Sequence, residues 1–176
     1  MLGMLAVLLL APAVHAQKRP TEYQVKAAYL FNFGKFVKWP ASAVSDKDFA
    51  ICLLGSDPFR GILQSIVSGE RIDGKPATVR HVNSAEDTTG CRIVFVSDSE
   101  QGQLGPIMAA LRRSPVLTVS DADGFVDHHG IIQFVMDGDR VRFQVNLSAA
   151  ENAGLVLSSE LLKVATAVKG KGQPGK

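Results

Sequence analysis

The sequence predicts an α/β protein with a single layered domain, in which a mixed β-sheet of about five to six strands is flanked by helices. Two observations predict this class. Between residues 49 and 119, short apolar segments typical of strands alternate with segments typical of helices, as in β-α-β units with a partly parallel sheet. Beyond them, two more strand-like segments are joined by a short link that contains Gly138, which predicts an antiparallel hairpin.

The first element is expected to be a helix within residues 21–40, ended by Pro40. One side of this helix is polar and carries Lys26, Asn32, Lys35 and Lys38. The other side is apolar and carries Val25, Ala28, Tyr29, Phe36 and Val37. Six of the twelve aromatic residues lie in this segment, and we expect them to form core. The alternative is that surplus rings, Phe31 or Trp39, contact a partner chain.

The remaining elements follow in short steps. Strands are predicted over residues 49–54, 77–82, 92–96 and 116–119, with helices near 59–67 and 104–111. The hairpin strands span 131–136 and 141–147. A capping box at Ser148 and Glu151 predicts the start of a helix, and Gly154 suits its end. A second short helix is expected from Ser158 through Val168, closed by Gly170.

The chain divides into three regions. Residues 1–16 form an uncharged apolar run that ends in Val14-His15-Ala16, which indicates a signal peptide and therefore export. Residues 17–168 form the domain. Residues 169–176 are a basic tail with three lysines, expected to be frayed and flexible. Without this tail the charge of the body is close to neutral, so the sequence gives no electrostatic sign of nucleic-acid binding.

Cys52 and Cys91 are the only cysteines, and 39 positions separate them. In an exported protein this spacing favours a structural disulfide, because metal and redox motifs need closely spaced cysteines. The alternative is a pair of buried free thiols in a reduced cytosolic protein.

Three predicted strands are followed by small or acidic polar residues, which are Ser56 and Asp57, Ser97 and Asp98, and Ser120 and Asp121. In an open α/β sheet, ligands bind outside the carboxyl ends of the strands, so these loops are candidates for one crevice. The same residue types also serve as helix N-caps. Because the carboxylates would repel phosphate, a ligand there would bring hydrogen-bond donors or a cation.

The sequence gives little support for an enzyme. It lacks the G-x-S-x-G and nucleotide-binding glycine motifs, and no cofactor is expected. No metal site is expected either, because the adjacent His128 and His129 lack ligand spacing and fit an exposed loop. Arg140 and Arg142 share the outer face of the hairpin, where they are solvated or belong to a polar contact surface.

Several motifs in order resemble the YfiR family of small periplasmic proteins. They are KAAYLFNFGKFVKWP, ICLLGSDPF, CRIVFVSDSE, PVLTVSDADGF and VRFQVNLSAAENAGLVLSSELLKVA, and the similarity runs from about Tyr23 to Val168. Members of the family often have two glycines before the second-last strand, whereas this chain has His129 and Gly130 there.

The resemblance implies a regulator without a reaction of its own. Such a protein would bind the periplasmic sensor domain of a membrane-bound diguanylate cyclase and repress it, and it would form homodimers. The resemblance also implies that Cys52 and Cys91 pair and that oxidation supports the active fold. The alternative function is a periplasmic receptor that binds a small ligand in the crevice outside Ser56, Ser97 and Ser120.

Overall fold

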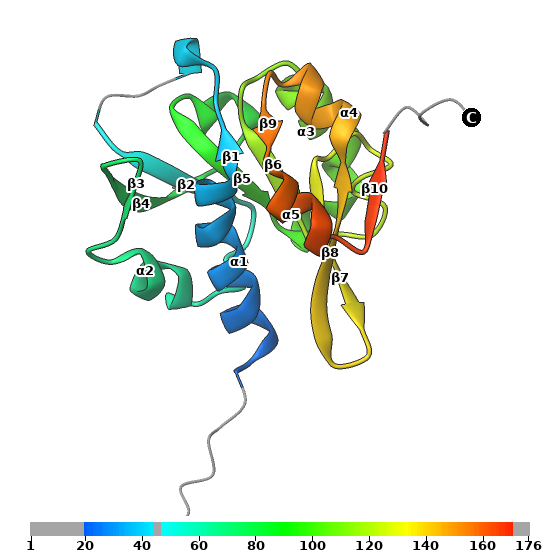
Figure 1. The fold of residues 1–176 in the computed structure, drawn as a ribbon, viewed down its shortest axis with the longest axis horizontal. Helices are drawn as coiled ribbons and strands as arrows, with labels where there is room; N and C mark the ends of the chain where they lie inside the picture. Colours follow the sequence, from blue (N-terminus) through cyan, green and yellow to red (C-terminus); the bar gives the residue numbers. More distant parts are fainter. Residues whose placement is uncertain (1–19, 44–46, 171–176) are drawn as a thin grey trace, which may run out of the picture.

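The computed structural model describes residues 20–43 and 47–170. Its centre is an eight-stranded mixed sheet with the order β10-β8-β7-β6-β5-β2-β4-β3 (Figure 1). The strands are β2 (Phe49–Leu54), β3 (Arg71–Ile72), β4 (Lys75–Val82), β5 (Cys91–Val96), β6 (Leu117–Ser120), β7 (Ile132–Asp137), β8 (Arg140–Asn146) and β10 (Ala167–Lys169). The helices are α1 (Glu22–Phe36), α2 (Ile62–Val67), α3 (Leu104–Leu111), α4 (Leu147–Asn152) and α5 (Ser159–Val164). A separate two-stranded sheet joins β1 (Val37–Lys38) to β9 (Val156–Leu157).

Five neighbouring strands, β4, β2, β5, β6 and β7, run parallel. The chain adds β4 on one side of β2 and then β5, β6 and β7 on the other. The order of strands therefore reverses between β2 and β5, which is the position where doubly wound α/β proteins open a crevice at the carboxyl ends of their strands.

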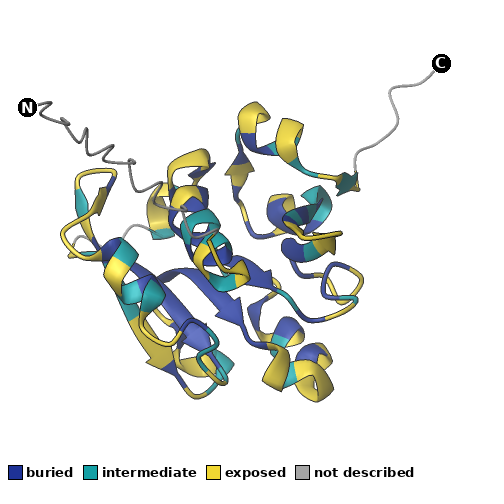
Figure 2. Cartoon of the chain, turned by 90° about the horizontal axis from the view of Figure 1, so that it is seen from below, coloured by how far each residue is buried: buried dark blue, intermediate teal, exposed yellow. Residues whose placement is uncertain are grey.

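Both faces of the central sheet are covered, and the residues of β2 pack alternately against the two faces. All six of its residues are buried. Ile51 and Leu53 contribute to the core cluster that includes α1, α2 and α5, whereas Cys52 and Leu54 contribute to the cluster that includes α3. Side chains alternate between the faces of a strand, so a strand buried on both faces is apolar throughout. In Figure 2 the central strands are accordingly dark blue, and the outer parts of the helices are yellow.

The sheet confirms the predicted α/β class, and it is wider than the five to six strands expected. One added strand is β3, which forms a hairpin with β4. The other is β10, which lies in the segment predicted as the end of a helix reaching Val168. Helix α5 stops at Val164 because Thr166 turns back to the sheet, where its backbone N–H and its hydroxyl both donate to the carbonyl of Phe143. Ala167 to Lys169 then pair with β8, so the first residue of the predicted tail belongs to the sheet.

Helix α1 departs from the prediction at its end and on both of its sides. It ends at Phe36 instead of near Pro40, because Val37 and Lys38 pair with β9. Lys26, placed on the polar side from the sequence, is buried, and Phe36, placed on the apolar side, is 42% exposed. These positions depend on which neighbours cover each end of the helix, and the pattern within one helix does not contain that information.

Helix α4 corrects the predicted capping box and confirms the predicted C-cap. Asn146 is the N-cap and accepts a hydrogen bond from the N–H of Ala149, while Ser148 lies inside the helix. At the other end Gly154 has a φ of 71°, and its N–H donates to the carbonyl of Glu151. The N–H of Leu155 donates to the carbonyl of Ala150, which completes a Schellman motif.

Gly130 permits a close approach that a larger residue would prevent. A Cβ atom at this position would lie 2.2 Å from two ring atoms of Phe125, which is fully buried. We therefore expect Gly130→Ala to lower the free energy of unfolding by about 1–3 kcal/mol, the usual range for overpacking. Urea unfolding measures this. Gly102→Ala is the control, because nothing lies within 4 Å of its added Cβ. Equal midpoints for the two variants would contradict the prediction.

Candidate functional site

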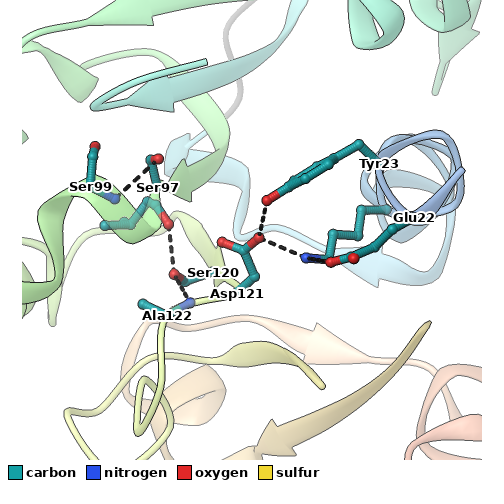
Figure 3. Close-up of polar contacts among 9 residues, drawn as sticks. Glu22, Tyr23, Ser97, Ser99, Ser120, Asp121 and Ala122 are labelled. Atoms are coloured by element: carbon teal, nitrogen blue, oxygen red, sulfur yellow. Dashed lines mark hydrogen bonds and ion pairs between the residues drawn. The ribbon is translucent and has the colours of Figure 1, made fainter. Parts of the chain in front are cut away.

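The carboxyl ends of β5 and β6 bring several predicted site residues together. Ser97 follows β5, Ser120 ends β6 and Asp121 comes next, and the three lie side by side in Figure 3. Ser56 and Asp57 follow β2, the next strand along the sheet. The predicted residues of the three loops therefore share one edge of the sheet, although the structure gives them different surroundings.

The polar side chains at this edge bond to nearby backbone groups, either in their own loops or, for Ser120, also on the neighbouring strand β5. The Oγ of Ser120 donates to the carbonyl of Val96 at 2.6 Å and accepts from the N–H of Ala122 at 2.9 Å (Figure 3). The Oγ of Ser97 accepts from the N–H of Ser99. The carboxylate of Asp57 likewise accepts from the N–H of Phe59 at 2.7 Å. These contacts fit the alternative in which the residues cap and brace the loops.

The crevice expected between β2 and β5 is filled by side chains. Gly55 has a φ of 89°, and a Cβ atom there would lie 2.6 Å from the Oγ of Ser99 and 2.7 Å from a carboxylate oxygen of Glu100. The Oγ of Ser99 also accepts a hydrogen bond from the N–H of Ser56 at 3.0 Å. Ser99 and Glu100 therefore occupy the place where doubly wound proteins hold a ligand.

Asp121 is the centre of a buried charge cluster. Its Oδ2 accepts from the Nζ of Lys26 at 2.7 Å and from the hydroxyl of Tyr23 at 3.1 Å (Figure 3). The Nζ of Lys26 also lies 2.5 Å from the carboxylate of Glu22, one turn earlier on α1. The side chains of Lys26 and Asp121 are only 5% and 9% exposed. The N-terminal end of α1 is thereby tied to the carboxyl end of β6.

The surroundings determine the protonation of this cluster. Burial acts to lower the pKa of Lys26, but its hydrogen bonds to Asp121 and Glu22 outweigh burial, so the pKa is raised. Burial and the negative charge of Asp121 raise the pKa of Tyr23. Lys26 is therefore a cation and Tyr23 a neutral hydrogen-bond donor at neutral pH.

A hollow of about 470 Å³ adjoins this cluster. Its lining includes the carboxylates of Asp98 and Asp123 and the apolar side chains of Phe134 and Met136. The Oδ1 of Asp121 is buried and has no hydrogen-bond partner among the described residues. The carboxylates in this lining offer acceptors to donor groups. Within the described part of the chain, no three side chains of metal-ligating type are close enough to hold an ion.

Sequence reasoning missed Lys26 and Tyr23 as partners of Asp121. The available signal was the spacing of Glu22 and Lys26, which places their side chains on one face of a helix. Nothing in the sequence indicated that this face would meet the end of a strand 95 residues later.

A second feature is an apolar groove between α1, β8 and α5, which we call the α1–α5 groove. It has a volume of about 440 Å³ and is lined by Tyr29, Asn32, Phe33, Phe36, Phe143, Glu160, Leu161 and Val164. Phe36 and Val164 are 42% and 53% exposed. Large apolar side chains that remain exposed together indicate a contact surface.

The other predicted contact residues lie apart from the Asp121 cluster. Trp39 is half-buried, and its indole N–H donates to the carbonyl of Arg92 at 3.2 Å, while its ring packs edge-on against Phe49. Phe31 is buried. Arg140 is exposed on β8, and Arg142 is half-buried on the same strand.

The disulfide between Cys52 and Cys91 is present, as predicted, with the two Cα atoms 5.9 Å apart. It forms because the β2–β5 register shifts between Ala50 and Ile51. Cys91 pairs with Ala50 and Ile93 pairs with Ile51, which leaves Arg92 as an extra residue. Cys91 therefore faces the side of the sheet on which Cys52 lies.

The fold and these features define a class, which is a disulfide-bonded α/β protein with a doubly wound core and an exposed apolar groove. A family model described as YfiR/HmsC-like matches residues 23–166, and the chain belongs to this family. At the level of the family, these proteins are periplasmic regulators of cyclic di-GMP signalling that act with partner proteins.

Two solved structures share the fold. A conserved domain protein from Vibrio cholerae O1 biovar El Tor strain N16961 is 11% identical, with a TM-score of 0.59 over 85% of this chain and 60% of that protein. An ABC domain from Streptococcus pneumonia in complex with L-Trp is 13% identical, with a TM-score of 0.53 over 84% of this chain and 60% of that protein. The present chain thus spans about 60% of the length of either structure.

The predicted signal peptide at residues 1–16 lies outside the described residues. Among the residues that are described, no helix combines the length and the hydropathy that a membrane span requires. In residues 169–176, Lys169 and Gly170 are described and residues 171–176 are not.

Proposed function

We propose that this protein is exported to the periplasm, where it represses a membrane-bound diguanylate cyclase by binding the periplasmic sensor domain of that enzyme. The observation that carries the proposal is the α1–α5 groove in a chain of the YfiR/HmsC-like family. Repression needs a surface that recognises another protein, and the described residues offer one with exposed apolar side chains at its rim.

The composition of the groove suits a protein partner. Tyr29, Phe33 and Phe143 form an aromatic floor, in which the ring centres of Phe33 and Phe143 are 5.1 Å apart. Phe36 and Val164 stand at the rim with Asn32 and Glu160. An apolar centre with a polar edge is the usual anatomy of a protein interface.

Binding through the groove is tested by placing a charge in it. We expect Val164→Asp and Phe36→Asp each to weaken binding of the cyclase sensor domain at least about tenfold, because the partner would have to bury an unpaired carboxylate. Biolayer interferometry with the purified sensor domain measures the affinity. Val156→Asp is the matched control, because Val156 is 63% exposed and lines neither the groove nor the hollow beside Asp121.

The outcomes of this experiment are distinct. Unchanged binding by both groove variants would place the interface elsewhere, for example at Trp39 or on the face that carries Arg140 and Arg142. If the unmodified protein binds no sensor domain, the proposed function itself is wrong.

We further propose that the disulfide makes this activity sensitive to redox conditions. Arg80 lies beside the bond, with its guanidinium 3.3 Å from the Sγ of Cys91 and 3.6 Å from the Sγ of Cys52. A nearby guanidinium stabilises a thiolate and thereby favours thiol–disulfide exchange. We also propose that the protein is a homodimer, and analytical ultracentrifugation tests this. If the dimer contact used the α1–α5 groove, dimerisation would compete with binding of the cyclase sensor domain.

A second candidate function is a receptor for a small ligand. The observation that favours it is the hollow beside Asp121, where the buried Oδ1 has no partner among the described residues. The carboxylates of Asp98 and Asp123 in its lining would accept hydrogen bonds from a ligand with an amino or hydroxyl group. A thermal-shift screen with amines, amino acids and sugars tests the candidate, and a melting temperature that no compound raises would exclude it.

A further inference from the structure

A basic pocket lies apart from every site described above. It has a volume of about 340 Å³ and is lined by Arg112, Arg113, His129 and Asn152. These side chains come from three separate segments, which are the end of α3, the loop before β7 and the end of α4. All four are exposed, and no carboxylate is among the lining residues.

The two guanidinium groups have no other role within the described residues. Arg112 and Arg113 follow the last turn of α3, where arginine often binds the free helix carbonyls. Here neither arginine forms a hydrogen bond or an ion pair with any residue described, and the carbonyl of Leu111 accepts from the N–H of Ser114 instead. Because both arginines line one pocket and have no counter-charge among the described residues, their donors are available to an anion.

His129 is held in an unusual backbone conformation. Its φ is 67°, a region that non-glycine residues rarely adopt and that costs about 1 kcal/mol or more. The neighbours of His129 hold it in this place. The N–H of Gly130 donates to the carbonyl of Phe125 at 2.9 Å, and the N–H of Val126 donates to the side chain of Gln133. The imidazole therefore projects from a rigid loop, and glycine at this position would relieve the strain.

We propose that this pocket binds the phosphate group of a phosphate-bearing small molecule. Paired guanidinium groups match the oxygens of a phosphate, and a histidine and an asparagine add further donors. Three separate segments thus bring four donor side chains to one pocket. This proposal is independent of repression through the α1–α5 groove.

Isothermal titration calorimetry of the purified protein tests the site with inorganic phosphate and with adenosine 5′-monophosphate. Sedimentation with phosphatidylglycerol vesicles tests a lipid headgroup as the source of the phosphate, with phosphatidylcholine vesicles as the reference. Binding to the soluble compounds or to the anionic vesicles would support the site and would identify the source. Absence of binding to all of these probes would overturn it.

Two double variants distinguish binding in this pocket from nonspecific electrostatic attraction. We expect the double variant Arg112→Ala/Arg113→Ala to weaken binding at least about tenfold. The matched control is Arg140→Ala/Lys163→Ala, which removes the same charge from exposed positions outside the pocket. Equal losses in both double variants would show nonspecific attraction and would overturn the proposal.

His129→Gly supplies a second test, which leaves both arginine charges in place. Glycine accepts a φ of 67°, so we expect a melting temperature that is not lowered, together with weaker phosphate binding. A variant that retains full affinity would overturn the site as proposed, because His129 is part of its lining.

Discussion

Replacing Cys52 by alanine is expected to lower the free energy of unfolding by about 2–5 kcal/mol, the range for loss of a native disulfide from a small secreted domain. The bond joins residues 39 positions apart. A crosslink over a loop of that length contributes about 4 kcal/mol through the reduced entropy of the unfolded chain in one disputed model. Both sulfurs are buried between the sheet and the α3 side of the core, so a packing defect adds to the loss.

Urea unfolding of the oxidised protein and of Cys52→Ala measures this effect. Dithiothreitol should shift the unmodified protein toward the midpoint of the variant and leave the variant itself unchanged. The double variant Cys52→Ala/Cys91→Ala controls for the single thiol that remains beside Arg80. Equal midpoints with and without reductant would show that the disulfide contributes nothing to stability.

Replacing Lys26 by alanine is expected to lower the free energy of unfolding by about 3 kcal/mol, because it leaves the buried carboxylate of Asp121 without its cation. After the substitution, Asp121 retains only the hydrogen bond from Tyr23, and its Oδ1 already has no partner among the described residues. Replacing both members by Lys26→Met and Asp121→Leu should be less damaging than Lys26→Ala alone, since no unpaired charge is then buried.

The effect of Lys26 should depend on pH in a defined direction. The folded-state pKa of Lys26 is raised above its ordinary value of 10.5, so its stabilising contribution is complete below that pH and is lost as the pH rises through the folded-state value. The difference in stability between the unmodified protein and Lys26→Ala should thus be constant from pH 7 to about pH 9 and shrink above pH 10.5. Lys38→Ala is the control, because Lys38 is exposed. A Lys26 variant as stable as the Lys38 variant would contradict the role assigned to the ion pair.

Local sequence patterns predicted those elements whose structure depends mainly on residues close together in the chain. Six strands, the tight β7–β8 hairpin and the cap at Gly154 follow from runs of apolar residues and from turn residues. Strand β10 was not predictable in this way. Residues 167–169 have an apolar spacing that also suits a helix, and the free edge of β8 decides between the two.

In the candidate sites too, the sequence indicated some residues, whereas only the tertiary structure shows their partners. The sequence indicated Ser97, Ser120 and Asp121 by their position after strands, but it gave no means of placing Lys26 and Tyr23 beside them. The α1–α5 groove combines Phe36 with Val164, which are far apart in the chain. A surface that two distant segments build together leaves no local pattern in either one.

The disulfide shows which features the sequence determines and which depend on the tertiary structure. By itself the sequence determined that two cysteines are present and that each lies in or next to an apolar strand. A regular β2–β5 register would have placed Arg92 opposite Ala50 and turned Cys91 to the face opposite Cys52, because side chains alternate along a strand. Only the tertiary structure, through the extra residue at Arg92, brings the sulfurs to one face of the sheet, since the pairing of two distant strands depends on packing across both cores.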